Sequence, residues 1–201
     1  INGTTVIATV QVGNYPFDVA YDSRNGFVYV ANMFSNNVSV ISGTSVVATI
    51  PVGSRPDGVG YDNGNGFVYV ANEGSDSVSV INGTTVVATL PVGRLPEGVA
   101  YDSRNGCIYV ANYGSPDPYS GNVSVISGTS VVATIPVGLD PIGAGYDSGN
   151  GYVYVANTAS NSVSVIDGTT VVATIPVGAN PECVTYSTRT GYIFVGIQGS
   201  N

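Results

Sequence analysis

Residues 58–92 read GVGYDNGNGFVYVANEGSDSVSVINGTTVVATLPV, and this stretch decides the fold. It contains four short runs rich in Val, Ile, Tyr and Thr, which β-strands favour. The runs are Gly58–Tyr61, Phe67–Ala71, Val78–Ile81 and Val86–Val92. An Asn-Gly pair follows the first run and another follows the third, and each supplies the positive φ of a tight hairpin. No segment has the 3.6-residue apolar period of an amphipathic helix. The stretch therefore predicts four antiparallel strands.

The same pattern repeats along the whole chain. A Gly-Thr-Thr/Ser-Val motif recurs every 40 residues, except for one step of 45 that carries an insertion around Ser115–Ser120. Its glycines are Gly3, Gly43, Gly83, Gly128 and Gly168. Four strands in about 40 residues are typical of a propeller blade, and a β-solenoid is less compatible because its coils are usually shorter. We therefore predict an all-β fold in which residues 1–201 form a single β-propeller domain of five repeats.

Two aromatic columns run through the repeats at a fixed period, which predicts packing between blades rather than a cofactor site. One column is Tyr21, Tyr61, Tyr101, Tyr146 and Tyr186, and the other is Tyr29, Tyr69, Tyr109, Tyr154 and Phe194.

Three motifs in fixed order resemble the YVTN-type β-propeller repeat. They appear as Tyr-Val-Ala-Asn at Tyr69–Asn72, Val-Ser-Val-Ile-Asp-Gly at Val163–Gly168 and Val-Ala-Thr-Ile-Pro-Val-Gly at Val172–Gly178. The resemblance covers every repeat. That family is best known from archaeal surface-layer and related cell-surface proteins, so the resemblance implies an extracellular or cell-surface location. Its members commonly form larger rings, often of seven blades, and five repeats do not supply such a ring.

The ends of the sequence do not complete a ring of five blades. By the same resemblance the chain begins with an outer strand, Thr4–Val12, and ends with two inner strands, Cys183–Tyr186 and Tyr192–Ile197. Thr4–Val12 would finish the last blade, but that blade lacks its third strand. Either the protein continues past Asn201, or another chain or an unassigned segment supplies the strand by β-augmentation.

The composition excludes most partners and most catalytic schemes. Thirteen carboxylates face five arginines, and the net charge of −8 disfavours nucleic acid and acidic membrane headgroups. No run of 18 apolar residues occurs, so we expect no membrane insertion. The chain has no His and no Lys, which rules out a Ser-His-Asp triad, a His-assisted metal site and a Schiff-base lysine within it. We expect no enzymatic activity, no cofactor and no metal.

Three further sets of residues have plain structural interpretations. Each aspartate of the Tyr-Asp-x-x-Asn-Gly turns is predicted to form an Asx turn. One carboxylate per turn supplies too few of the roughly six to eight oxygen ligands that a calcium site needs. These aspartates are Asp22, Asp62, Asp102 and Asp147. Cys107 and Cys183 have no metal-ligand spacing and are predicted to be unpaired, buried thiols. Four Asn-x-Ser/Thr sequons suit a secreted glycoprotein but are no more than chance would give. They begin at Asn2, Asn37, Asn82 and Asn122.

Comparison of the repeats separates constant loops from variable ones. Asp-x-x-Asn-Gly and Ser/Asn/Asp-Gly-Thr are nearly constant, and alternation of strand direction places both on one rim. The variable loops fall on the other rim. One class precedes the first strand of each blade: Asn14–Phe17, Ser54–Asp57, Arg94–Glu97, Leu139–Ile142 and Ala179–Glu182. The other class follows Tyr-Val-Ala-Asn: Met33–Asn37, Glu73–Ser77, Tyr113–Asn122 and Thr158–Ser162.

The variable loops hold five aromatic residues outside the two columns, together with nine of the eighteen charged residues. Aromatic and charged side chains gathered on a rigid scaffold favour a binding face. The predicted face consists of Tyr15, Phe17, Phe34, Arg55, Asp57, Glu73, Arg94, Glu97, Tyr113, Tyr119 and Glu182.

The sequence thus predicts a non-catalytic, structural or adhesive cell-surface module whose partners are other cell-surface proteins, glycans or copies of itself. Two alternatives stay open. One is a lectin-like propeller in which a sugar stacks on Tyr113, Tyr119 or Phe34. The other is a lyase-type propeller enzyme whose active site lies in blades outside this sequence.

Overall fold

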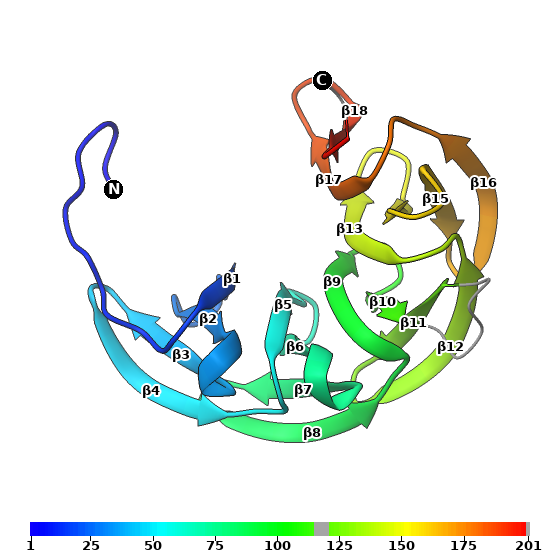
Figure 1. The fold of residues 1–201 in the computed structure, drawn as a ribbon. Coiled ribbons are helices and arrows are strands. Elements are labelled where there is room, and N and C mark those ends of the chain that lie inside the picture. The colour runs from blue at the N-terminus through cyan, green and yellow to red at the C-terminus, as the bar shows by residue number, and fades with distance from the viewer. Residues whose placement is uncertain (115–120, 200–201) are drawn as a thin grey trace.

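The computed structural model describes residues 1–114 and 121–199, and it confirms an all-β propeller architecture. Four sheets have four antiparallel strands each, and a fifth has two. In Figure 1 the sheets follow one another around an open arc. The strands of the first two blades are β1 (Pro16–Tyr21), β2 (Val28–Asn32), β3 (Asn37–Ser42) and β4 (Ser45–Pro51), then β5 (Pro56–Tyr61), β6 (Val68–Asn72), β7 (Ser77–Asn82) and β8 (Thr85–Pro91). The others are β9 (Arg94–Asp102), β10 (Cys107–Gly114), β11 (Gly121–Ser127), β12 (Ser130–Val137), β13 (Pro141–Asp147), β14 (Tyr152–Asn157), β15 (Ser162–Asp167), β16 (Thr170–Pro176), β17 (Pro181–Ser187) and β18 (Tyr192–Ile197).

The hairpin between the first two strands of a blade forms through an Asx turn, as the sequence predicts. In the second blade an Oδ1 atom of Asp62 accepts hydrogen bonds from the backbone N–H groups of Gly64, at 2.7 Å, and Asn65, at 3.2 Å. Gly66 then takes a φ of +85°, a conformation that glycine adopts without steric cost. The aspartate is therefore used by its own turn, as are its equivalents in the neighbouring blades.

Glycines allow the inner strands to approach closely around the axis. A Cβ added to Gly58 of β5 would lie 2.1 Å from the carbonyl oxygen of Glu97 in β9. The equivalent Gly98 and Gly143 face carbonyl oxygens of the next inner strand at 2.2 and 2.4 Å. Side chains at the neighbouring position are therefore brought together from blades that are 40 residues apart in sequence.

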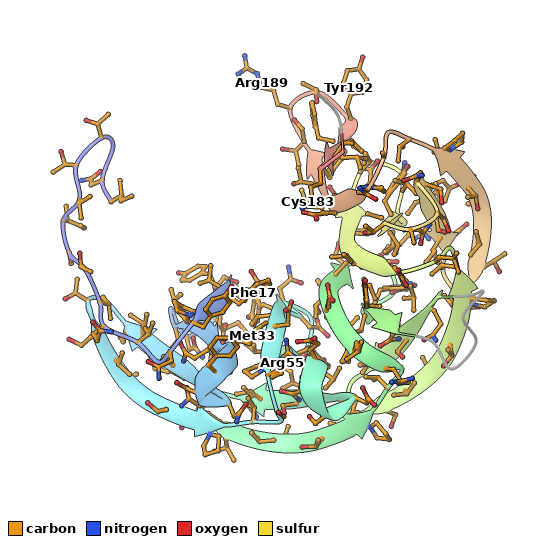
Figure 2. All side chains as sticks on the ribbon, viewed as in Figure 1. Phe17, Met33, Arg55, Cys183, Arg189 and Tyr192 are labelled. Atoms are coloured by element: carbon orange, nitrogen blue, oxygen red, sulfur yellow. The ribbon has the colours of Figure 1, made fainter. Side chains whose placement is uncertain are left out.

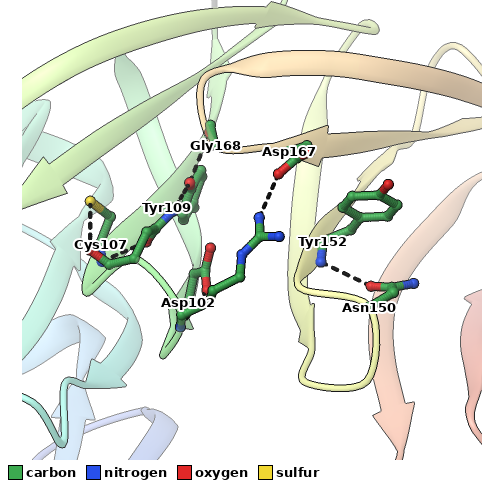
Figure 3. Close-up of polar contacts among 9 residues, drawn as sticks. Asp102, Cys107, Tyr109, Asn150, Tyr152, Asp167 and Gly168 are labelled. Carbon is green, nitrogen blue, oxygen red and sulfur yellow. Dashed lines mark hydrogen bonds and ion pairs between the residues drawn. The ribbon is translucent and has the colours of Figure 1, made fainter.

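Tyrosines of the second strands fasten each blade to the next. The hydroxyls of Tyr29, Tyr69 and Tyr109, which are fully buried, donate hydrogen bonds of 2.8–2.9 Å to glycine carbonyls in the following blade. Figure 3 shows the bond from Tyr109 to Gly168. The prediction that this column packs between blades is confirmed for these three residues.

The asparagine that ends each Tyr-Val-Ala-Asn strand organises the middle of its sheet. The Nδ2 of the buried Asn72 lies 3.2 Å from the Ser77 hydroxyl and 3.0 Å from the Ser79 hydroxyl, both on β7. A Cβ on Gly53 would lie 2.6 Å from Cγ of the same asparagine. The Pro-Val-Gly motif therefore ends in glycine because the asparagine occupies the adjacent space.

The prediction of an outer strand at Thr4–Val12 is wrong for this structure. Only an isolated bridge between Asn2 and Thr5 forms there, and Figure 1 places the N-terminal segment across the opening of the arc from β18. An outer strand needs a third strand to bond with, and the fifth sheet is described only as β17 and β18. Among the described residues no sheet precedes the first blade, and Val19 is 58% exposed while its equivalent Val59 is 7% exposed.

The two cysteines are free, as predicted, but they are not buried. Cys183 is exposed and Cys107 is half-buried. Cys183 occupies the position of Gly58, Gly98 and Gly143, where the other blades meet the next inner strand. In the described structure no sheet follows β18, so Cys183 stays exposed, with its Sγ beside Gly196 of β18.

Candidate functional site on the variable rim

The two classes of variable loop are bonded together on one rim. In the second blade the backbone N–H of Glu73 donates to the carbonyl of Arg55 at 2.9 Å, and that of Gly74 donates to Ser54 at 2.9 Å. The N–H of Ser54 donates to the Ser75 hydroxyl at 3.0 Å. The first blade repeats the arrangement between Asn14–Tyr15 and the short 3-10 turn η1 (Met33–Ser35); η2 (Glu73–Ser75) is its counterpart in the second blade. The predicted grouping of both classes on one rim is correct.

The residue before the proline near the start of each repeat's first strand has a left-handed backbone conformation. Its φ lies between 49° and 55° at Tyr15, Arg55, Leu95, Asp140 and Asn180. Such a conformation is costly for bulky residues and persists only where the surroundings fix it. Side chains of the preceding blade provide that support: Oδ1 of Asn36 accepts from the N–H of Arg55 at 2.8 Å, and Oδ1 of Asp76 accepts from that of Leu95 at 2.9 Å. The backbone of the rim is thus fixed while its side chains differ.

The constant loops gather on the opposite rim. The Arg104 guanidinium, from an Asp-x-x-Asn-Gly turn, forms an ion pair with Asp167 in the Asp-Gly-Thr turn of the next blade. Figure 3 draws this pair beside the bond from Tyr109 to Gly168. These turns serve contacts between blades, which explains why they vary little from repeat to repeat.

Three aromatic residues cluster on the variable rim of the first blade. The ring of Tyr15 stacks on Phe34, with centroids 4.6 Å apart and planes at 27°, and lies 6.3 Å from that of Phe17. All three side chains are more than half exposed. We call this set the aromatic cluster. Phe17, labelled in Figure 2, lies against the second blade, because it lines a pocket together with Asp57 and Gly58 of β5.

In the second blade the positions of Tyr15 and Phe17 carry the charged residues Arg55 and Asp57, and the position of Phe34 is Gly74. Arg55 occupies the place of Tyr15, and its guanidinium forms an ion pair of 3.0 Å with Glu73. The Arg55 side chain is half exposed, whereas Glu73 is largely covered. The predicted residues Arg55 and Glu73 therefore lie together on the rim.

A pocket of about 220 Å³ opens where the first four inner strands begin. Its lining is Phe17, Asp18, Asp57, Gly58, Glu97, Gly98, Ile142 and Gly143. We call it the acidic pocket. The pairing of β5 with β6 is irregular between Pro56 and Val59, and such a bulge re-aims the side chains within it. Asp57 lies in that bulge and is only 7% exposed, so it is a pocket residue rather than part of an open surface.

Burial raises the pKa of both pocket carboxyls that lack a basic partner. Desolvation, followed by the charges of Glu73 and Asp18, raises the pKa of Asp57 to about 7. Desolvation, followed by the charges of Asp57 and Glu73, raises the pKa of Glu97 to about 8. Arg55 opposes both shifts but does not cancel them. Both groups therefore exchange protons near neutral pH.

The other predicted face residues lie around this centre or away from it. The charge of Asp140, followed by burial and the charge of Glu97, raises the pKa of Tyr113, which is half-buried on β10 and does not line the acidic pocket. Arg94 is exposed at the start of β9, and Glu182 is half-buried at the start of β17. Tyr119 lies outside the described residues. The sequence prediction missed Asp18, although its replacement of the glycine found in the next three repeats was a usable signal.

The four sequons fall into two structural classes. Asn2, in the isolated bridge with Thr5, and Asn82, the last residue of β7, are exposed. Asn37 and Asn122 are half-buried in strands, and their Oδ1 atoms each accept a 2.8 Å hydrogen bond from the buried asparagine of the neighbouring strand.

Within residues 1–114 and 121–199, no group of three or more His, Cys, Asp or Glu side chains is placed to hold a metal ion. The same residues contain no helix of the length and apolarity needed to cross a membrane.

Comparisons with known proteins support the fold alone. No protein-family model matches the chain, and no curated protein does. The chain is similar to a solved streptogramin B lyase, with 12% identity and a TM-score of 0.76, over 90% of this chain and 62% of the lyase. It is also similar to a catalytically inactive histidine-to-alanine variant of virginiamycin B lyase from Staphylococcus aureus with quinupristin, with 11% identity, a TM-score of 0.79, and coverage of 97% and 74%. A functionally unknown protein from Desulfotomaculum acetoxidans DSM 771 matches at 15% identity and a TM-score of 0.78, over 98% of this chain and 67% of that protein. The chain is therefore a β-propeller of four complete blades and a partial fifth, and it spans less than two thirds of the streptogramin B lyase.

Proposed function

We propose that this chain is a non-catalytic recognition module that binds its partner through the variable rim, as structural and adhesive cell-surface proteins do. The observation that carries the proposal is the contrast between the two rims. One rim has loops fixed by hydrogen bonds and side chains that change from blade to blade, and the other has side chains occupied by contacts between blades. A preordered surface loses little entropy on binding, which favours recognition.

The YVTN-like motifs support a cell-surface setting, where the partners would be other surface proteins, glycans or copies of the chain. The stacked and exposed pair Tyr15 and Phe34 favours glycan as a second candidate, since sugars pack on exposed aromatic rings. Two of the similar structures are lyases, and one of these is inactive with a histidine replaced; this chain contains no histidine, which supports a binding role over catalysis.

The repeats themselves provide the test. A Tyr15→Arg/Phe34→Gly variant carries the second blade's residues on the same backbone, since φ is 55° at Tyr15 and 52° at Arg55. The matched control is Tyr192→Ser, which removes an exposed aromatic ring next to a turn on the constant rim.

Binding is measured on a glycan array, and self-association by sedimentation. We expect binding or association by the unmodified chain that the rim variant weakens tenfold or more and that the control leaves within twofold. The proposal fails if the unmodified chain neither binds a glycan on the array nor associates with itself. It also fails if only the control variant loses binding.

A further inference from the structure

The acidic pocket contains a carboxylate that the fold does not use. Asp57 is 7% exposed, and none of the described residues donates a hydrogen bond to it. A buried carboxylate without a partner is costly and is retained where it has a task. The side chain lines the pocket, so a ligand there would provide the missing partner.

The neighbouring groups leave Asp57 and Glu97 as the acceptors in reach of a ligand. Asp18 is already occupied, because its two oxygens accept backbone N–H bonds of 2.8 Å from Val19 and Val59. Arg55 is the nearest cation, and it pairs with Glu73 instead. When Asp57 and Glu97 are ionised, the pocket therefore has an excess of negative charge over positive.

The lining selects an organic cation over a metal ion. Calcium and magnesium need six or more oxygen ligands, and the described residues hold no group of three acidic side chains, histidines or cysteines arranged for a metal. Two of the walls are instead the apolar Phe17 and Ile142. An ammonium or guanidinium group donates to carboxylates and also packs on an aromatic ring.

We propose that the acidic pocket binds an ammonium or guanidinium group, with Asp57 and Glu97 as its acceptors and Phe17 against its flank. The inference deepens the proposed function and rests on it, because it makes the variable rim selective for basic ligands. The group can come from a free amine or from a Lys or Arg side chain of a partner protein.

Binding is coupled to protons because the cation requires ionised carboxylates. The charged groups that face Asp57 and Glu97 are Asp18 of β1, Arg55 ahead of β5, Glu73 of η2 and Asp140 ahead of β13. With pKa values of about 7 and 8, the two acceptors lose their protons between pH 6 and pH 9. Affinity for the cation therefore rises across this interval.

The test is calorimetric titration of the chain with agmatine and, separately, with the peptide acetyl-Gly-Lys-Gly-amide. We expect both to bind, more tightly at pH 9 than at pH 6, while 1-butanol and calcium chloride do not. The Asp57→Asn/Glu97→Gln variant should weaken binding tenfold or more. The control Asp76→Asn removes a carboxylate from the same rim but keeps the oxygen that accepts from Leu95, so it should change affinity less than twofold.

Preference for the peptide over agmatine identifies a partner's side chain as the source, and the reverse identifies a free amine; both support the pocket. The pocket proposal is overturned if neither probe binds or if calcium binds in their place. It is also overturned if the Asp57→Asn/Glu97→Gln variant binds the probes as tightly as the unmodified chain. The two proposals fail separately. The aromatic-cluster variant tests the rim without altering the acceptors, and the acceptor variant leaves the aromatic cluster intact.

Discussion

The hydroxyl of Tyr69 in the second blade donates a 2.9 Å hydrogen bond to the carbonyl of Gly128 in the third, 59 residues further along the chain. The same hydroxyl receives a 3.0 Å bond from Nδ2 of Asn65 in its own blade. One side chain thus joins a hairpin, a strand and the neighbouring blade on the constant rim. The scaffold is held at this rim, which leaves the opposite rim free to vary.

Replacing Tyr69 by Phe should therefore destabilise the chain. The change removes a buried hydroxyl and leaves the Gly128 carbonyl without that donor, which costs about 1–3 kcal/mol in free energy of unfolding. Tyr154→Phe is the matched control, because among the described residues only Asn150 bonds that hydroxyl. Urea denaturation should show a clearly larger loss for Tyr69→Phe, and equal losses would contradict the tie between blades.

Gly58→Ala should disturb the axis of the arc. The new Cβ would meet the Glu97 carbonyl, which is backbone and cannot move aside cheaply. Gly43→Ala provides the comparison: its φ of +59° imposes strain of about 1–2 kcal/mol, but nothing lies within 4 Å. We expect a markedly lower thermal midpoint for Gly58→Ala than for Gly43→Ala, and the opposite order would refute the close approach of the inner strands.

Stability should fall as the pH rises through the neutral range. The folded state holds protons on Asp57 up to about pH 7 and on Glu97 up to about pH 8, whereas an unfolded chain releases them near pH 4. Their contribution is complete below about pH 4 and is lost between there and pH 8, on the order of a few kcal/mol. Because the Asp57→Asn/Glu97→Gln variant has no such protons, its stability relative to the unmodified chain should rise over this interval. A constant difference between the two would show that these carboxyls titrate normally.

Sequon use should follow exposure. When the chain is secreted from a host that glycosylates asparagine, we expect glycan on Asn82, which is exposed at the end of β7, and little on Asn37 or Asn122, whose amides are hydrogen-bonded. Peptide mapping by mass spectrometry measures the occupancy. Preferential modification of Asn37 or Asn122 would be inconsistent with the folded strands described here.

Local signals account for most of what the sequence predicts correctly. The second blade is predicted as Gly58–Tyr61, Phe67–Ala71, Val78–Ile81 and Val86–Val92, and both ends of every run agree with the observed strand to within two residues. Hairpins are encoded by Asn-Gly and Asp within a few residues, so a single sequence suffices. Comparison among the repeats then separated the two rims.

The features that the sequence predicted wrongly depend on contacts between distant residues, which no local sequence pattern encodes. Asp57 is predicted as part of an exposed face but is buried, because the inner strands approach across the glycines and enclose it. Thr4–Val12 has strand composition but no third strand to pair with. Cys183 is exposed because no described sheet follows β18. In each case the outcome depends on whether another described strand or blade packs against the segment.

Hydrogen–deuterium exchange tests the central claim that the variable rim is the binding surface. The chain is measured with and without a glycan selected on the array or, where it self-associates, above and below the dissociation constant. We predict protection in peptides that cover residues 14–17, 33–37, 54–57 and 73–77, with the turns at 62–66 and 82–85 unchanged. Protection confined to those constant turns would place the binding surface on the opposite rim and contradict the account.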